Sequence, residues 1–118
     1  NVVIGALCNG RMAGGGQVLS ANAYIDDGLL DAVSLESFSI ADIATVIEEL
    51  QQTAPQDGHF VHRKQVKKIQ WRASTIMPIN LDGEPLNDYN VNIEVLPQVL
   101  ALVLPEHCPL LKHAVLAK

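Results

Sequence analysis

The chain has 118 residues, of which 48% are hydrophobic, and a formal net charge of −5 at pH 7. This length and apolar content predict one folded domain, and the acidic balance disfavours nucleic acid as a partner. The longest apolar run, Val99 to Leu104, is far shorter than the roughly 20 residues that cross a bilayer, and no signal peptide is visible. Cys8 and Cys108 lack metal-ligand spacing, so we predict free buried thiols in a reducing cytoplasm.

The first predicted elements are a buried strand and a glycine-rich loop. Val2 to Leu7 is a continuous β-branched run that Asn9-Gly10 ends as a turn, so we predict a strand buried on both faces. Residues 14–16, three glycines, lack the Lys-Ser/Thr of a phosphate-binding loop and the spacing of a dinucleotide fingerprint. Close backbone packing is therefore the preferred interpretation of these glycines.

An acidic loop follows over residues 24–31, with Asp26, Asp27 and Asp31 placed around Gly28. Magnesium prefers oxygen ligands in octahedral geometry, often one carboxylate with carbonyls and waters, so a turn around Asp27 could hold this ion. A plain Asp-Gly turn explains the same residues without any ligand. Residues 32–38 then alternate as in a half-buried strand.

One amphipathic helix is predicted over about residues 40–52. Ser39 precedes it, and Asp42 lies three residues further on, as in a capping box. The apolar stripe consists of Ile40, Ile43, Ala44, Ile47 and Leu50, and the polar face of Glu48, Glu49, Gln51 and Gln52. Pro55 and Gly58 end the helix, to which we assign a structural role.

Histidines and basic residues come next. His59 and His62 lack a third ligand at suitable spacing, so a surface loop is preferred to a zinc site. Five basic residues then alternate with apolar ones on what reads as one strand. This basic cluster consists of Arg63, Lys64, Lys67, Lys68 and Arg72. Most clusters of this kind are solvated or edge-protecting faces of a sheet.

The strongest candidate for a functional site is the stretch of residues 81–85, Leu-Asp-Gly-Glu-Pro, because alternating runs flank it on both sides. Asp82-Gly83 is predicted to form a hairpin turn, since Gly83 tolerates a positive φ and Pro85 fixes its own φ. Asp82 and Glu84 then project from a constrained corner. An ordinary polar turn accounts for the same residues.

A last strand is predicted at residues 99–104, after which Pro105 and Pro109 end regular structure. Several short strands with one capped helix indicate a mainly β fold. We predict an antiparallel β-sandwich that forms one domain over residues 1–118. The chain opens without methionine, and we expect it to be a piece of a longer protein.

Taken in order, three motifs resemble the C-terminal half of bacterial diacylglycerol kinase-like lipid kinases, in particular the YegS branch. They are Asn9-Gly10 with the glycines 14–16, the acidic loop from Ile25 to Asp31, and residues 82–85. The closing residues 104–111 are similar to the end of that branch. Cys8 and Ala21 depart from a common glycine and a common proline, and neither change affects an acidic position.

The resemblance implies a two-domain, ATP-dependent kinase that acts on a lipid hydroxyl, such as that of diacylglycerol or phosphatidylglycerol. An α/β domain upstream of Asn1 would bind ATP through a Gly-Gly-Asp-Gly-Thr loop. Residues 1–118 without that domain would be inactive. Glu84 would be the proton acceptor, with Asp82 beside it. The carboxylate of Asp27 and the backbones of Tyr24 and Leu29 would hold a structural or regulatory magnesium ion.

The lipid substrate also gives the basic cluster a second interpretation, because a kinase of this kind must reach an anionic membrane. The sequence does not indicate an oligomeric state. The alternative to a lipid kinase is a non-catalytic β-sandwich that binds a small ligand or a partner and uses its acidic turns for structure alone.

Overall fold

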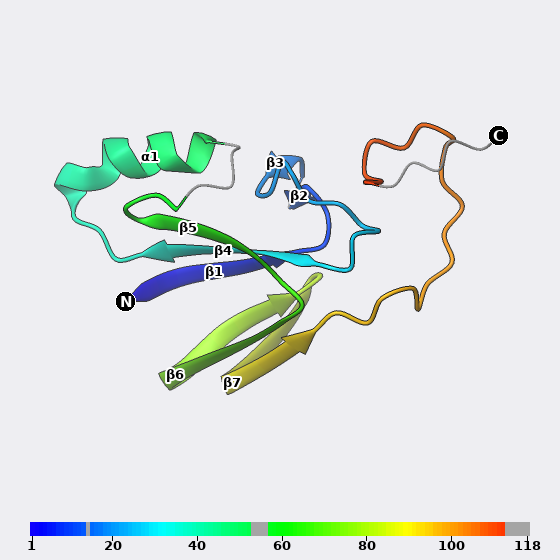
Figure 1. Cartoon of the computed structure of the whole chain (residues 1–118). Helices are drawn as coiled ribbons and strands as arrows, with labels where there is room; N and C mark the ends of the chain where they lie inside the picture. The colour runs from blue at the N-terminus through cyan, green and yellow to red at the C-terminus, as the bar shows by residue number, and fades with distance from the viewer. Residues whose placement is uncertain (14, 53–56, 113–118) are drawn as a thin grey trace.

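The computed structural model describes residues 1–13, 15–52 and 57–112 of the chain (Figure 1). Among these residues, strands predominate, and one short helix lies between the fourth and fifth strands. The elements are β1 (Val2–Cys8), β2 (Met12–Ala13), β3 (Gln17–Val18), β4 (Leu30–Glu36), a 3₁₀ turn (Ile40–Asp42), α1 (Ile43–Gln51), β5 (Val61–Val66), β6 (Lys68–Leu81) and β7 (Glu84–Glu94).

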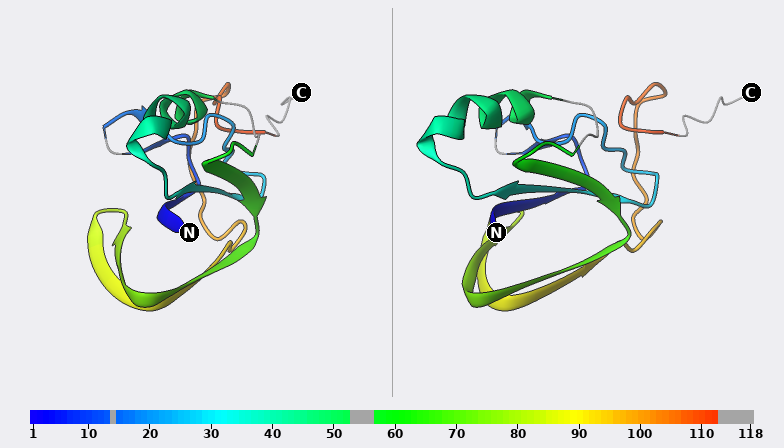
Figure 2. Two further views of the ribbon diagram at one scale, coloured as in Figure 1. Left: turned by 90° about the vertical axis from the view of Figure 1, so that its left-hand side faces the viewer. Right: turned by 60° about the vertical axis from the view of Figure 1, so that its left-hand side comes forward.

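The central layer is an antiparallel sheet in the order β1-β4-β5. Val33 in β4 pairs with Ala6 of β1 and with Arg63 of β5, so β4 lies in the middle and β1 is an edge strand. Helix α1 covers one face of this sheet and the β6–β7 ribbon lies against the other (Figures 1 and 2). Val33, together with Val46 of α1 and Val61 of β5, is buried.

The β6–β7 ribbon forms the second layer of the sandwich. Its pairing is interrupted between Arg72 and Met77, and Figure 2 shows the ribbon curving into a U. Bulges bend strands in this way because an unpaired residue disrupts the hydrogen-bond ladder locally. Trp71 packs on β1, where a Cβ added to Gly5 would lie 3.2 Å from the indole ring. The predicted antiparallel β-sandwich with one helix is confirmed.

Two strand predictions were wrong. Residues 2–4 of β1 are exposed and not buried on both faces, because β1 is an edge strand and α1 covers β5 instead. Residues 99–104 form no strand, and Val99, Leu100, Leu102 and Val103 are largely exposed. Apolar composition alone does not make a strand, because the backbone of a strand must form hydrogen bonds with the free edge of another strand. No described strand pairs with this segment.

The helix begins as predicted. The Asp42 carboxylate accepts hydrogen bonds from the backbone N–H of Ser39 (3.0 Å) and from its hydroxyl (2.6 Å), and these bonds lower the pKa of Asp42. The predicted apolar stripe, however, is not the buried face. Ile40, Ile43, Ile47 and Leu50 are exposed, whereas Val46 and Glu49 are buried. Glu49 was therefore wrongly placed on the polar face.

The buried Glu49 side chain fixes α1 to the start of β5. Its carboxylate accepts three backbone hydrogen bonds, from the N–H groups of His59 (2.7 Å), Phe60 (2.9 Å) and Val61 (2.9 Å). Gly58 lies so close to this carboxylate that an added Cβ would collide with it. The helix is therefore rotated so that Glu49, and not the apolar stripe, faces the sheet.

Three further predictions require correction. The glycines at 15 and 16 have open space around them and adopt positive φ values of 82° and 103° in the β2–β3 turn, so conformation and not close packing explains them; residue 14 lies outside the described residues. His62 belongs to β5 and not to a loop. The basic cluster spans two strands, because β5 ends at Val66 and β6 begins at Lys68.

Within the described part of the chain, no helix is long and apolar enough to cross a membrane. Both Cys8 and Cys108 are free and buried, as predicted. Burial, followed by the neighbouring charge of Asp31, raises the pKa of the Cys8 thiol.

Candidate functional site

The tip of the β6–β7 ribbon is a two-residue hairpin turn. Asp82 and Gly83 have φ values of 49° and 103°, which is the signature of a type I′ turn and agrees with the prediction. Asn80 stabilises the turn, since its side-chain oxygen accepts a hydrogen bond of 2.8 Å from the Gly83 N–H. The contribution of Asn80 was missed at the sequence level, although an Asx residue before Asp-Gly is a turn signal.

The register of the ribbon determines on which face Glu84 lies. Glu84 pairs with Leu81, and two residues along each strand Leu86 pairs with Ile79. Cross-strand partners and alternate residues share a face of a β-ribbon, so Glu84 lies on the face that carries the half-buried Ile79. Glu84 and Asp82 themselves are exposed, so their carboxylates are accessible to a reactant outside the domain.

The acidic loop holds Asp27 in a different environment. Gly28 has a φ of 70°, and one Asp27 oxygen, Oδ1, accepts a hydrogen bond of 3.0 Å from the Leu29 N–H. The Asp27 side chain is only 2% exposed. Its second oxygen, Oδ2, is buried and has no hydrogen-bond partner among the described residues. Buried polar atoms are rarely left without a partner, so this oxygen is suited to a ligand.

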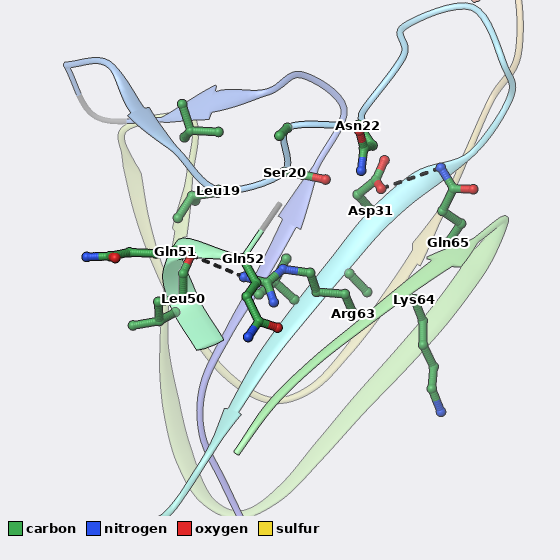
Figure 3. Close-up of a pocket in the computed structure, with 14 residues that line it drawn as sticks. Leu19, Ser20, Asn22, Asp31, Leu50, Gln51, Gln52, Arg63, Lys64 and Gln65 are labelled. Carbon is green, nitrogen blue, oxygen red and sulfur yellow. Dashed lines mark hydrogen bonds between the residues drawn. The ribbon is translucent and has the colours of Figure 1, made fainter. Parts of the chain in front are cut away.

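The three acidic side chains of this loop do not converge on one point as predicted. Asp26 accepts a hydrogen bond of 2.7 Å from the Lys112 N–H. Asp31 belongs to β4 and contacts Gln65 of β5 at 3.5 Å (Figure 3). Burial raises the pKa of Asp31, against hydrogen bonds from Ser20 and Gln65 that lower it. The charge of Asp27 also raises the pKa of Asp31 and that of Lys112 lowers it, so the three carboxylates are neighbours with different hydrogen-bond partners.

The donor set at Asp27 fits a hard cation. One buried carboxylate oxygen without a hydrogen bond, on the same turn as the backbones of Tyr24 and Leu29, provides the oxygen chemistry that magnesium prefers. No group of three or more His, Cys, Asp or Glu side chains suited to a metal occurs among the described residues. The predicted site has one carboxylate and backbone carbonyls, so the absence of such a group does not test it. The magnesium site remains a prediction.

The C-terminal segment, residues 105–112, lies against the acidic loop, a contact that no motif in the sequence predicts. Arg11 donates hydrogen bonds to the carbonyls of Ala23 (3.1 Å) and Pro109 (2.8 Å). The Ile25 N–H donates to the Leu110 carbonyl at 3.0 Å. Arg11 therefore links Ala23, which precedes the loop, to Pro109, which is 98 residues from Arg11 in the chain.

The acidic loop and the hairpin tip are separate sites. They overlap in Figure 1, but the left view of Figure 2 places the tip and the loop on opposite sides of the molecule. An ion at Asp27 would accordingly act at a distance from Glu84. This separation is compatible with a structural or regulatory ion and not with one that contacts the reacting groups at the tip.

A pocket of about 260 Å³ with a mixed polar and apolar lining lies between the β3–β4 loop, β4, β5 and the end of α1 (Figure 3). Arg63 projects beside it and donates hydrogen bonds to the carbonyls of Glu49 (3.2 Å) and Leu50 (3.4 Å) at the end of the helix. Arg63 is thus occupied within the fold. Asp31 is the only predicted acidic-loop residue among the pocket's described lining residues.

The two histidines have different neighbours. The ring of His59 packs edge-to-face on Phe60, with the ring centroids 4.6 Å apart. His62 lies between carboxylates of Glu36 (3.8 Å) and Asp57 (3.7 Å). These contacts place the two rings in separate clusters.

Comparison with known proteins identifies the class of this domain. The family model described as the YegS C-terminal NAD kinase beta sandwich-like domain matches residues 1–104. The chain therefore belongs to the YegS family, in agreement with the resemblance of its motifs. The matched region includes both the acidic loop and the hairpin tip.

Individual relatives support the same conclusion. A "Probable lipid kinase YegS-like" of Shewanella frigidimarina is 42% identical over 111 residues, which cover 94% of this chain and 36% of the relative. A protein of the same name from Chromohalobacter salexigens is 40% identical over 109 residues, or 92% of this chain and 35% of the relative. The "Probable lipid kinase YegS" of Escherichia coli O1:K1 is 40% identical over 111 residues, with 94% and 36% covered. The chain spans about a third of each relative.

Proposed function

We propose that the chain is the C-terminal domain of a cytoplasmic, ATP-dependent lipid kinase of phospholipid metabolism, in which another domain binds ATP. The names of the relatives and the 36% share of their length that the chain spans support this proposal. The observation that carries it is the hairpin tip, where Asn80 stabilises the turn and Glu84 is exposed next to it.

In the proposed reaction, a lipid hydroxyl oxygen forms a bond to the γ-phosphorus of ATP. The bond between that phosphorus and the β,γ-bridging oxygen breaks, and ADP leaves. Glu84 accepts the proton of the attacking hydroxyl as general base. Asp82, the first residue of the turn, orients Glu84 or contributes to binding a catalytic cation. Diacylglycerol and phosphatidylglycerol are the lipids that we propose as acceptors.

Transfer of labelled phosphate from ATP tests this function. The full-length protein is incubated with γ-labelled ATP and a panel of lipid hydroxyls, and the products are separated by thin-layer chromatography. We expect one labelled lipid that requires both ATP and the acceptor. A folded protein that labels no lipid would favour the alternative, a non-catalytic β-sandwich that binds a ligand or partner.

We further propose that Asp27 binds magnesium through Oδ2, with carbonyls of Tyr24 and Leu29 as additional ligands. The ion supplies positive charge that neutralises the buried carboxylate and orders the loop. Asp27→Asn should abolish magnesium binding measured by calorimetry with the full-length protein, because an amide is a weaker ligand for a hard cation. Asp26→Asn is the matched control, because an asparagine oxygen can still accept the hydrogen bond from the Lys112 backbone N–H. Equal binding by Asp27→Asn and the wild type would exclude Asp27 as a ligand.

The basic cluster is proposed to contact anionic membrane. Lys67 is exposed and has no carboxylate within 4.0 Å in the described part of the chain, whereas Lys68 pairs with Glu94 at 3.4 Å. Each basic residue near an anionic surface contributes about 1 kcal/mol. Co-sedimentation with phosphatidylglycerol vesicles should therefore weaken about tenfold or more in the double variant Lys67→Glu and Lys68→Glu, and should weaken with salt. Binding that is absent or insensitive to salt would instead favour the interpretation of the basic cluster as a solvated, edge-protecting face.

A further inference from the structure

We infer that Lys112 is a built-in competitor for the cation at Asp27, so that its ammonium group and a divalent ion exclude each other at the same carboxylate oxygen. This inference rests on the proposed magnesium site and adds a residue that sets its affinity. The contact between Lys112 and Asp27 joins two segments that are distant in the chain, the C-terminal segment and the acidic loop.

The ammonium group of Lys112 lies near the buried Asp27 oxygen without forming a hydrogen bond to it. Lys112 Nζ lies 3.9 Å from Asp27 Oδ2, which is longer than a hydrogen bond. Oδ2 accordingly remains buried without a hydrogen bond although a cation is nearby. The Lys112 side chain is 47% exposed and that of Asp27 only 2%. The carboxylate is therefore fixed inside the fold, and its cationic partner approaches from the solvent side.

Electrostatic repulsion opposes simultaneous binding of the two cations. A magnesium ion bound to Oδ2 would sit about 2.1 Å from it, and the ammonium group lies 3.9 Å from the same oxygen. Two cations this close to one oxygen repel each other, and solvent screens the repulsion only in part because Asp27 is buried. Binding of the ion therefore requires the Lys112 side chain to move away. The lysine lowers the apparent affinity for the metal because the ion must displace it.

Movement of the Lys112 side chain does not require the C-terminal segment to detach. The Lys112 backbone N–H donates to Asp26, and the Leu110 carbonyl accepts from Ile25. Arg11 holds the Pro109 carbonyl and stacks over the Tyr24 ring at 5.1 Å. None of these contacts uses the Lys112 ammonium, which lies 6.0 Å from the centroid of the Tyr24 ring and would lose that contact together with the one to Asp27. The side chain can swing into solvent while the segment stays in place.

Calorimetric titration of the full-length protein with magnesium chloride tests the inference. Lys112→Met removes the charge and keeps the length and the backbone contacts, so it should tighten the magnesium Kd about two- to tenfold. Lys112→Arg retains the charge and should remain near the wild-type Kd. Lys64→Met is the control for loss of an exposed lysine elsewhere, because Lys64 lies on β5.

The outcomes separate this inference from the metal site itself. Magnesium binding that is lost in Asp27→Asn but identical in wild type and Lys112→Met would overturn the competitor role and leave the site intact. Binding that Asp27→Asn does not change would overturn both. Weaker binding by Lys112→Met, with a circular dichroism spectrum like that of the wild type, would also contradict the inference, since the lysine would then assist the metal.

Discussion

Glu84→Gln in the full-length protein should lower the kcat of the proposed lipid phosphorylation by about 10²- to 10⁴-fold, while ATP binding and the melting temperature stay near their wild-type values. The substitution keeps the size of the side chain and removes its ability to accept a proton. The fold should tolerate it because Glu84 is exposed and the turn is held by Asp82, Gly83 and Asn80 instead. Steady-state kinetics with labelled ATP measure the change.

The rigid turn explains why the expected effect is large. A general base contributes most when it is already aimed at its substrate, because little conformational freedom is then lost in the transition state. Glu94→Gln is the matched control, since Glu94 lies on the same strand at the far end from the tip and pairs with Lys68. A Glu84→Gln enzyme with near wild-type kcat would exclude the role. If the variant lost activity because it unfolded, the role of Glu84 would be structural and not catalytic.

Glu49→Gln should lower the melting temperature by roughly 3–8 °C. The two carboxylate oxygens of Glu49 accept three backbone N–H groups from residues 59–61. Glutamine has one acceptor oxygen and turns an NH₂ group toward the remaining donors. Backbone donors at the start of β5 then lose their partner in a buried position. Differential scanning calorimetry measures the shift.

The same contact predicts a dependence on pH. The hydrogen bond from Phe60, followed by those from Val61 and His59, holds the pKa of Glu49 below its ordinary value of 4.5, against the opposing effect of burial. A carboxyl with a lowered pKa in the folded state stabilises the fold fully above its unfolded pKa. This contribution is lost as the pH falls through the lower, folded pKa. The difference between wild type and Glu49→Gln should therefore shrink below about pH 4.5.

Two further variants test the interpretation of Glu49. Glu48→Gln changes the exposed neighbour and should leave the melting temperature almost unchanged. Gly58→Ala places a methyl group against the Glu49 carboxylate and should destabilise the protein in the same direction. A Glu49→Gln protein as stable as the wild type at neutral pH would show that these hydrogen bonds contribute nothing net.

The elements that the sequence predicted well depend on local signals. The hairpin turn at Asp82-Gly83 needs only positive φ values between two alternating strands, and the helix start needs only Ser39 and Asp42. Both signals lie within a few residues. The sandwich class followed from the number of such short elements, and the family motifs added the acidic loop.

The features that sequence reasoning missed depend on contacts between distant residues. Glu49 has the composition of a polar helix face, and only the position of residues 59–61 makes it buried. Arg11 and Lys112 reach the acidic loop from opposite ends of the chain. Residues 99–104 have the apolar composition of a strand, yet strand formation requires a partner edge that composition does not reveal.

The most direct test of the central proposal is the stoichiometry of phosphate transfer by the full-length protein. ADP release is measured in parallel with the phosphorylated lipid, which is identified by mass spectrometry, for wild type and Glu84→Gln. We predict one lipid phosphate for each ADP in the wild type, and a loss of both in the variant by about 10²-fold or more. ADP formation without any phosphorylated lipid, or equal lipid phosphorylation by both proteins, would contradict the account.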